Sequence, residues 1–163
     1  MTISVASKSQ LEIIQNLAKA IWPAAYSSIL SQEQLDYMMD MMYSDDSLNN
    51  QLQKNNVFLL AENNDVFIGF ASYELNYNNS NFTKIHKLYV LPEIQGKGVG
   101  KDLIFHIQNI AKNQSNTGLI LNVNKYNKAK DFYLHNGFEI ADSVVVDIGD
   151  GYVMDDFIMI KSI

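Results

Sequence analysis

The sequence contains no cysteine, and none of its twelve basic residues is an arginine. Without cysteine the chain has no disulfide framework, no thiol chemistry and no thiolate ligand for a metal. Its three histidines are widely spaced, which gives no support to a metal site. No apolar run approaches the length of a membrane span, and the first ten residues lack a basic region followed by an apolar stretch. We therefore expect no metal, no membrane contact and a cytoplasmic protein.

Charge is unevenly distributed along a chain whose net charge is −6. Residues 84–130 hold eight lysines and two acids, a local charge of +6, whereas the remainder has four lysines against sixteen acids. A basic middle suits a ligand that carries phosphates, and an acidic remainder suits a cationic small molecule better than nucleic acid. The alternative for any single carboxylate is that it merely solvates the surface.

Hydrophobic periodicity divides the chain into strands and helices that suit one domain, residues 1–163. Strands are expected at Thr2–Ala6, Val57–Glu62, Val66–Leu75, Lys84–Val90, Leu119–Asn124, Phe138–Ile148 and Tyr152–Ile160. Helices are expected around Leu11–Ile21, Ser31–Met42, Val99–Ile110 and Asn127–Asn136. Pro23 is expected to interrupt the first helix, with a helical segment continuing around Ala24–Leu30. Residues 47–55 are expected to add a further helical turn.

The stretch Lys84–Gly100 organises the middle of the chain. It reads as an apolar strand, a turn opened by Pro92, and a glycine-rich loop that feeds a helix near Val99. Backbone N–H groups at the positive end of a helix dipole form a site for a pyrophosphate. Glycines allow phosphates to approach closely and allow positive φ angles.

The spacing of the glycines separates the possible phosphate ligands. The P-loop pattern is absent, and Gly96, Gly98 and Gly100 give G-x-G-x-G rather than the dinucleotide pattern G-x-G-x-x-G. No acidic residue follows some 20 positions later to bind a ribose. The sequence therefore argues against a nicotinamide cofactor.

The loop resembles the acyl-CoA loop of the GNAT superfamily of N-acetyltransferases. The superfamily pattern [Q/R]-x-x-G-x-[G/A] is met by Gln95, Gly98 and Gly100. Downstream, a strand is followed by Asn127-Lys128-Ala129, then Tyr133, then Asn136-Gly137-Phe138, which is similar to the superfamily's second conserved half. The resemblance extends from about residue 57 to residue 160.

This resemblance implies an α/β fold with a GNAT-like mixed, mostly antiparallel sheet of about seven strands. A central strand pair would splay apart where acetyl-CoA enters, and about four helices would flank the sheet. The expected cofactor-binding residues are Leu88, Tyr89 and Val90 for the pantetheine, Gln95, Gly96, Lys97, Gly98, Val99, Gly100 and Lys101 for the pyrophosphate, and Asn127 and Lys130. Because many relatives use an arginine in this loop, lysine charge and backbone geometry would have to substitute for it here.

The implied reaction is direct attack of an amine on the acetyl group of acetyl-CoA. Tyr133 stands where the superfamily places the acid that protonates the leaving thiolate. The alternative is that Tyr133 is only a half-buried aromatic residue. At the strand position where relatives often carry a general base, this chain has Lys84 or His86, and Glu74 is a second candidate.

Three further stretches of the sequence indicate which class of amine is the acceptor. Trp22–Tyr26, a methionine-rich helix and Gly151–Asp156 resemble the bacterial PaiA-type polyamine acetyltransferases, which implies spermidine or spermine as acceptors. The methionine-rich helix either packs in the core or lines the acceptor site. Its apolar stripe comprises Leu35, Met38, Met39 and Met42, with Asp36, Asp40, Asp45 and Asp46 nearby.

Three alternatives stay open at this stage. The acceptor could be a protein N-terminus or another small amine, because such relatives would share the CoA half. The chain could also be a non-catalytic acyl-CoA-binding regulatory module, or a partner-binding domain with a degenerate loop. Many relatives pair through their C-terminal strands, so the resemblance also implies a homodimer.

Overall fold

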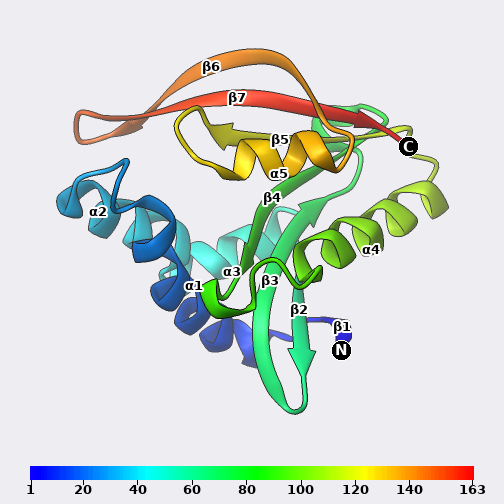
Figure 1. Ribbon diagram of the computed structural model, residues 1–163, viewed down its shortest axis with the longest axis horizontal. Helices are drawn as coiled ribbons and strands as arrows, with labels where there is room; N and C mark the ends of the chain where they lie inside the picture. The colour runs from blue at the N-terminus through cyan, green and yellow to red at the C-terminus, as the bar shows by residue number, and fades with distance from the viewer.

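The computed structural model describes residues 1–163 as one seven-stranded mixed sheet with helices on both faces (Figure 1). The strand order is β1-β2-β3-β4-β5-β7-β6, and every neighbouring pair is antiparallel except β4 and β5. The strands are β1 (Thr2–Val5), β2 (Val57–Asn63), β3 (Val66–Glu74), β4 (Phe82–Val90), β5 (Gly118–Asn124), β6 (Glu139–Gly149) and β7 (Tyr152–Ser162). The predicted α/β fold with a mostly antiparallel seven-stranded sheet is confirmed.

Five helices accompany the sheet, one more than the four expected from the sequence. They are α1 (Leu11–Tyr26), α2 (Gln32–Tyr43), α3 (Asp45–Gln53), α4 (Val99–Asn113) and α5 (Ala129–His135). The additional helix is α3, which was expected only as a turn. It forms because the Ser44 side chain accepts a hydrogen bond from the Ser47 N–H at 3.3 Å and so caps the helix. None of the five is long and apolar enough to cross a membrane.

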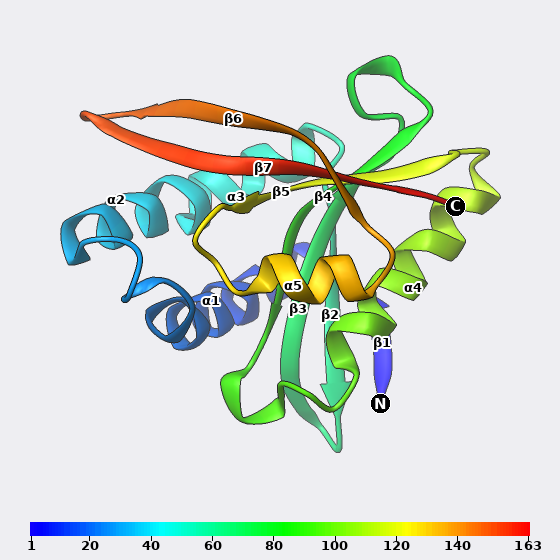
Figure 2. The same cartoon turned by 45° about the horizontal axis from the view of Figure 1, so that its top comes forward.

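Alternating side chains along the central strands supply two separate cores. On one face, Leu59 and Ala71 pack with α4 and α5, around Leu103 and Tyr133. On the other face, apolar residues of β2 and β3 pack with α1, α2 and α3. The two helix layers are separated by the sheet in Figure 2. A site that opens through the sheet would therefore be bordered by both layers.

Helix α1 differs from the expectation that Pro23 would interrupt it, and that prediction was wrong. The helix continues through Pro23 to Tyr26. Proline lacks one N–H, but its own carbonyl still accepts a hydrogen bond from the Ser27 N–H at 3.1 Å. The helix ends three residues after Pro23, so only a few backbone hydrogen bonds of α1 follow the proline. The Trp22 and Tyr26 side chains are thereby held on one helix, next to the sheet.

Strands β4 and β5 separate part-way along their length, as the sequence predicted. They pair in parallel only from Phe82 with Gly118 to Ile85 with Leu121. Beyond that point β4 stays paired with β3, and β5 stays paired with β7. Figure 1 shows β5 running beside β7 while β4 descends with β3. Residues 86–90 of β4 therefore have one edge without a strand partner.

The hairpin of β6 and β7 is a long arm that reaches over α2 (Figure 1). Two side chains of α2 hold it there. The Tyr37 hydroxyl donates to the Ile148 carbonyl at 2.6 Å, and the Gln34 amide donates to the Val153 carbonyl at 3.1 Å. The arm, α1 and α2 thus form a continuous wall on one face of the sheet.

Candidate active site

A cavity of about 910 Å³ lies where β4 and β5 separate. Its lining includes Leu88 and Tyr133 from the α4–α5 face and Trp22 and Met38 from the α1–α2 face. Because the two strands are unpaired here, the cavity passes from one face of the sheet to the other. Such a passage can admit one reactant from each side.

The glycine-rich loop lies at one end of this cavity. Gly96 and Gly98 have φ angles of +79° and +90°, in the left-handed region that favours glycine. No side chain caps α4, so the N–H groups of its first turn are left for another acceptor. An added Cβ on Gly100 would stand 3.0 Å from the Phe132 ring, which shows how closely α4 approaches α5. The loop therefore offers backbone donors and little side-chain bulk, as a pyrophosphate requires.

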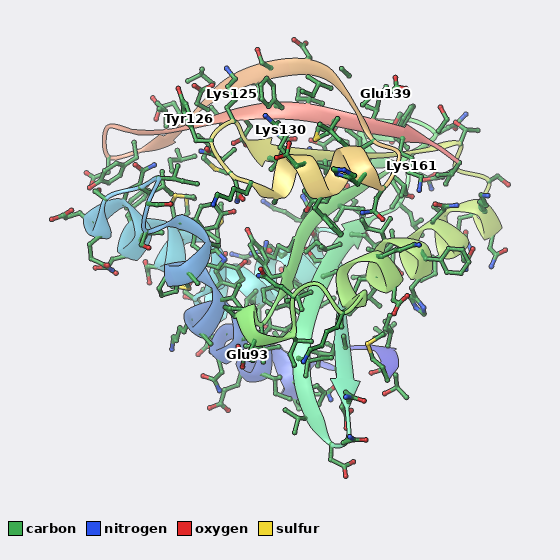
Figure 3. The ribbon with its side chains drawn as sticks, viewed as in Figure 1. Glu93, Lys125, Tyr126, Lys130, Glu139 and Lys161 are labelled. Atoms are coloured by element: carbon green, nitrogen blue, oxygen red, sulfur yellow. The ribbon has the colours of Figure 1, made fainter.

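The structure brings most of the predicted site residues together. Eleven line the cavity: Leu88, Tyr89, Val90, Gln95, Gly96, Gly98, Val99, Gly100, Lys101, Asn127 and Tyr133. Lys97 and Lys130 are not among the lining residues. The Lys130 ammonium lies 5.9 Å from the centre of the Phe157 ring, and Figure 3 labels it on the side of α5 that faces β7. The sequence alone could not reveal which way these two flexible side chains turn.

Tyr133 is positioned by α5 between two aromatic neighbours. Its ring centre lies 5.3 Å from that of Phe132 and 5.6 Å from that of Phe138. The residue is only 7% exposed, and its hydroxyl makes no hydrogen bond within the chain. Burial raises the pKa of Tyr133 well above its usual value, and the nearby Tyr26 acts in the same direction. The hydroxyl therefore carries its proton at neutral pH and is available as a donor inside the cavity.

Two polar side chains shape the edges of the cavity near α5 and the loop. The side-chain oxygen Oδ1 of Asn127 accepts a hydrogen bond from the Ala129 N–H at 2.8 Å and so supports the start of α5, as the sequence predicted. The Gln95 amide donates to the Val90 carbonyl at 3.2 Å, which ties the loop to the free end of β4. Both contacts fix backbone that borders the cavity.

Of the three general-base candidates, Lys84 contacts Asn122, whereas His86 and Glu74 are paired with each other. The Nε2 atom of His86 lies 2.9 Å from a carboxylate oxygen of Glu74. A register shift in the β3–β4 ladder leaves His86 without a partner residue on β3, at the point where β4 leaves β5. Burial lowers the pKa of His86, while the Glu74 hydrogen bond acts in the opposite direction. His86 lines the cavity, whereas Glu74 does not.

The α1–α2 face supplies an aromatic and methionine-rich wall. Trp22, Tyr26 and Tyr43 border the cavity there, together with Met38 and Met42 of α2. The Trp22 and Tyr26 ring centres lie 4.9 Å apart. The methionine-rich helix therefore does both things considered from the sequence: its stripe packs in the core and also faces the cavity. The acids considered with it are not lining residues: Asp36, Asp40, Asp45 and Asp46.

Comparison with known proteins agrees with this geometry. The acetyltransferase (GNAT) domain family matches residues 26–152. The chain belongs to the GNAT acetyltransferase family. The resemblance seen in the glycine loop and the Asn127–Phe138 region is thereby confirmed, and acetyl-CoA is the co-substrate.

The chain is also similar to individual acetyltransferases in sequence and in structure. It is 28% identical over 169 residues to the spermidine N(1)-acetyltransferase of Thermoplasma acidophilum, covering 99% of this chain and 98% of the relative. A crystal structure of the PaiA N-acetyltransferase of the same organism, in complex with coenzyme A, is 29% identical, covers all of both chains and has a TM-score of 0.82. The ribosomal-protein-S18-alanine N-acetyltransferase of Escherichia coli shares the fold at 18% identity, with a TM-score of 0.73 and coverage of 99% and 93%. One fold thus serves unlike acceptors.

One cavity residue was given no role from the sequence, although it ends the stretch Gly151–Asp156 that resembles polyamine acetyltransferases. Asp156 of β7 is 2% exposed, lines the cavity, and has a carboxylate oxygen, Oδ1, with no hydrogen-bond partner in the chain. Burial raises the pKa of Asp156, with the Asn122 amide and the Lys84 ammonium acting in the opposite direction. The alternation of side chains along β7 could have indicated that Asp156 lies on the same buried face as Met154. The pairing that sets β7 beside β5 is long-range, however, and had no local signal.

Proposed function

We propose that this single-domain protein transfers the acetyl group of acetyl-CoA to a primary amine of a polyamine such as spermidine or spermine. The observation that carries the proposal is the cavity that passes through the sheet from the glycine loop to the wall of Met38, Met42 and Met154. Flexible thioether side chains suit a flexible aliphatic chain. Similarity along the full chain to a spermidine N(1)-acetyltransferase supports the same acceptor class.

The cofactor half of the proposal rests on backbone groups. The unpaired edge of β4 at Leu88–Val90 would pair with the pantetheine arm as a further strand would. One N–H of this segment would donate to the thioester carbonyl and polarise it. The uncapped start of α4 and the residues Gln95–Lys101 would hold the pyrophosphate. Lysine charge in this loop adds attraction without the fork geometry of arginine.

The chemical half assigns one proton donor and one proton acceptor. The neutral amine nitrogen attacks the acetyl carbonyl carbon, and the carbon–sulfur bond breaks. Tyr133 would donate its proton to the sulfur, because its hydroxyl is protonated, unpartnered and at the cavity. His86 would take a proton from the incoming ammonium through water, and Glu74 would orient its ring.

Thiol release from acetyl-CoA tests the proposal. We would compare spermidine, spermine, simple diamines and peptides with a free N-terminus as acceptors, at equal concentration. Turnover confined to the polyamines and diamines is the expected result. Turnover confined to peptides would favour a protein N-terminal acetyltransferase instead. Binding of acetyl-CoA without thiol release for any amine would favour a regulatory module.

The edge of the sheet supports a second proposal, that the enzyme is a homodimer joined through β6. This strand is one of the two edges of the sheet, the other being β1, and it is exposed along most of its length. Val145 and Val146 are apolar and exposed by 61% and 39%, in a position that edge strands usually protect with charge. Sedimentation velocity of the wild type and of Val145→Lys would test it. A dimer that dissociates on this substitution is expected, and a monomeric wild type would refute it.

A further inference from the structure

Asp156 is a buried carboxylate with one oxygen atom, Oδ1, that has no hydrogen-bond partner. Its side chain lies on β7, opposite Asn124 of β5, at the height where β4 and β5 have already separated. It is 2% exposed and faces the cavity, yet its Oδ1 atom accepts no hydrogen bond from the chain. A buried carboxylate oxygen without a hydrogen bond is costly, and a donor that enters the cavity would remove this cost.

The nearest cation of the chain is directed elsewhere. The Lys84 ammonium donates a hydrogen bond to the carbonyl oxygen of the Asn122 side chain, and it also lies over the Tyr77 ring at 5.3 Å. Lys125 is paired with the neighbouring Asp155 at 2.5 Å. Both lysine charges still act on Asp156 through space, but neither lysine makes an ion pair with it, because their direct contacts are to Asn122 and Asp155. The Oδ1 atom therefore remains free to accept a hydrogen bond from a cation that enters the cavity.

Asp156 faces the acceptor side of the sheet. Side chains alternate along β7, and Met154 packs in the α1–α2 core whereas Phe157 and Met159 pack in the α4–α5 core. Asp156 therefore shares the face of Met154 and lies on the opposite face from Tyr133. Its charge also contributes to the raised pKa of Tyr26 on α1, which places the two side chains near each other.

We propose that Asp156 binds a non-reacting ammonium group of the acceptor and so selects amines that carry a second positive charge. This inference rests on the proposed amine acetylation and adds a specificity-determining residue to it. The ammonium bound by a carboxylate is stabilised in its charged form. The reacting nitrogen must lose its proton before attack, so the carboxylate suits a nitrogen that stays protonated throughout.

The walls around Asp156 define the acceptor further. Met38, Met42 and Met154 line the same face of the cavity and would contact the methylene chain between two nitrogens. A diamine or polyamine satisfies both parts, because its methylenes meet the methionines while its second ammonium meets the carboxylate. A monoamine of the same length leaves Asp156 without a partner and gains only the apolar contacts.

The test compares a diamine with a monoamine of equal chain length, 1,4-diaminobutane against butylamine, in wild type and Asp156→Asn. Asp155→Asn is the matched control, because Asp155 is the adjacent carboxylate and is already paired with Lys125. Calorimetric titration of each amine into the enzyme bound to CoA measures binding, and thiol release measures kcat and KM.

The wild type is expected to bind the diamine roughly tenfold to hundredfold more tightly than the monoamine, which is the range of one hydrogen-bonded charge pair. Asp156→Asn should remove this preference by raising the KM and Kd for the diamine alone, with kcat unchanged. Asp155→Asn should keep it. Equal losses for both amines, or a fall in kcat, would show that Asp156 acts on the reacting nitrogen or on the fold and would overturn the proposal.

Two failures are distinguishable in this design. If the wild type prefers the diamine in binding but releases no thiol with it, the proposed function fails while the ammonium site stands. If the wild type acetylates diamines but Asp156→Asn retains the full preference for them, the ammonium site fails while the proposed function stands.

Discussion

The hydroxyl groups of Tyr26 and Tyr89 lie 2.9 Å apart and are joined by a hydrogen bond. Tyr26 ends α1, whereas Tyr89, 63 residues later, lies on the part of β4 that has left β5 and is paired only with β3. Burial raises the pKa of both hydroxyls, so the bond persists throughout the ordinary pH range. This contact fixes the aromatic and methionine-rich wall of the cavity relative to the strand proposed to hold the thioester.

Removing this bond should weaken the protein modestly and loosen the acceptor site. For Tyr26→Phe we expect a loss of about 1 kcal/mol in the free energy of unfolding, the usual net value of one hydrogen bond. The KM for the acceptor should rise more than the KM for acetyl-CoA, because Tyr26 lies on the aromatic and methionine-rich wall that is proposed to hold the acceptor. Urea unfolding and steady-state kinetics would measure the two effects.

A double-mutant cycle isolates the Tyr26–Tyr89 pair. Tyr26→Phe, Tyr89→Phe and the double variant should give a coupling energy of about 1 kcal/mol. The control is Tyr37→Phe, whose hydroxyl bonds the Ile148 carbonyl instead. Additive losses for Tyr26 and Tyr89 would show that the two hydroxyls do not act on each other.

Tyr133→Phe should slow the chemical step and leave cofactor binding intact. Loss of a general acid costs about a hundredfold or more in kcat, and the ring would still pack between Phe132 and Phe138. The Kd for acetyl-CoA and the unfolding midpoint should stay near wild-type values. Tyr152→Phe is the matched control. An unchanged kcat in Tyr133→Phe would mean that the thiolate leaves without this proton.

Gly98→Ala should impair binding of acetyl-CoA beyond its effect on stability. The position has a φ of +90°, so alanine is strained there by about 1 kcal/mol or more. Gly151 provides a close control, because its φ is +79°, an added Cβ also meets nothing within 4 Å, and it lies in the β6–β7 hairpin turn. Both variants should lose similar stability. The Kd for acetyl-CoA should rise only in Gly98→Ala, and equal Kd values would argue that the loop does not hold the cofactor.

Lys87 should make stability depend on pH above neutrality. Burial lowers the pKa of Lys87 to about 8 from 10.5, and its ammonium donates to Gln51 at 2.5 Å. Between pH 8 and pH 10.5 the unfolded chain binds more protons than the folded chain, so stability rises with pH over this window. Relative to Lys87→Met, the wild type should gain up to about 3 kcal/mol between pH 7 and pH 10.5.

Measuring the difference between the two proteins removes contributions from other titrating groups, including the buried tyrosines. Chemical unfolding at half-unit pH steps would provide the curves. Lys54→Met, at an exposed lysine, is the control. A difference between wild type and Lys87→Met that stays constant with pH would contradict the buried, easily deprotonated state of Lys87.

Local signals predicted the parts of this structure that depend on local chemistry. Ser31 caps α2 as expected, accepting a hydrogen bond from the Gln34 N–H at 3.2 Å, and Asn127 supports the start of α5. Two of the three loop glycines, Gly96 and Gly98, have the positive φ angles that the pattern allowed. The predicted interruption at Pro23 was wrong: proline removes one hydrogen bond from the interior of α1, but the helix continues to Tyr26.

The acceptor half depended on contacts between distant segments and was less predictable. Asp156 reaches the cavity only because β7 pairs with β5, and the Tyr26–Tyr89 bond depends on how α1 crosses the sheet. Neither relation has a spacing signature in the sequence. Of the four aspartates considered near α2, none reaches the cavity, because they lie on the outward side of their helices.

The pairing of His86 with Glu74 leads to a prediction about the acid limb of the pH profile. Burial lowers the pKa of His86 below its usual 6.5, so its ring is neutral at pH 7 and can accept a proton. If His86 is the base, kcat/KM for the amine should fall as the pH drops through this lowered value. Glu74→Gln removes a negative charge that raises the pKa of His86, so the acid limb should move to lower pH.

His86→Gln should abolish that limb and reduce kcat/KM by about a hundredfold, the scale of one general base. His135→Gln is the control, because His135 lies at the end of α5 and bonds the Asp131 carbonyl. Profiles measured with a diamine between pH 5 and pH 9 would decide the matter. An acid limb that is unchanged by both Glu74→Gln and His86→Gln would mean that titration of the amine itself sets the limb. Solvent would then remove the proton, and His86 would not be the base.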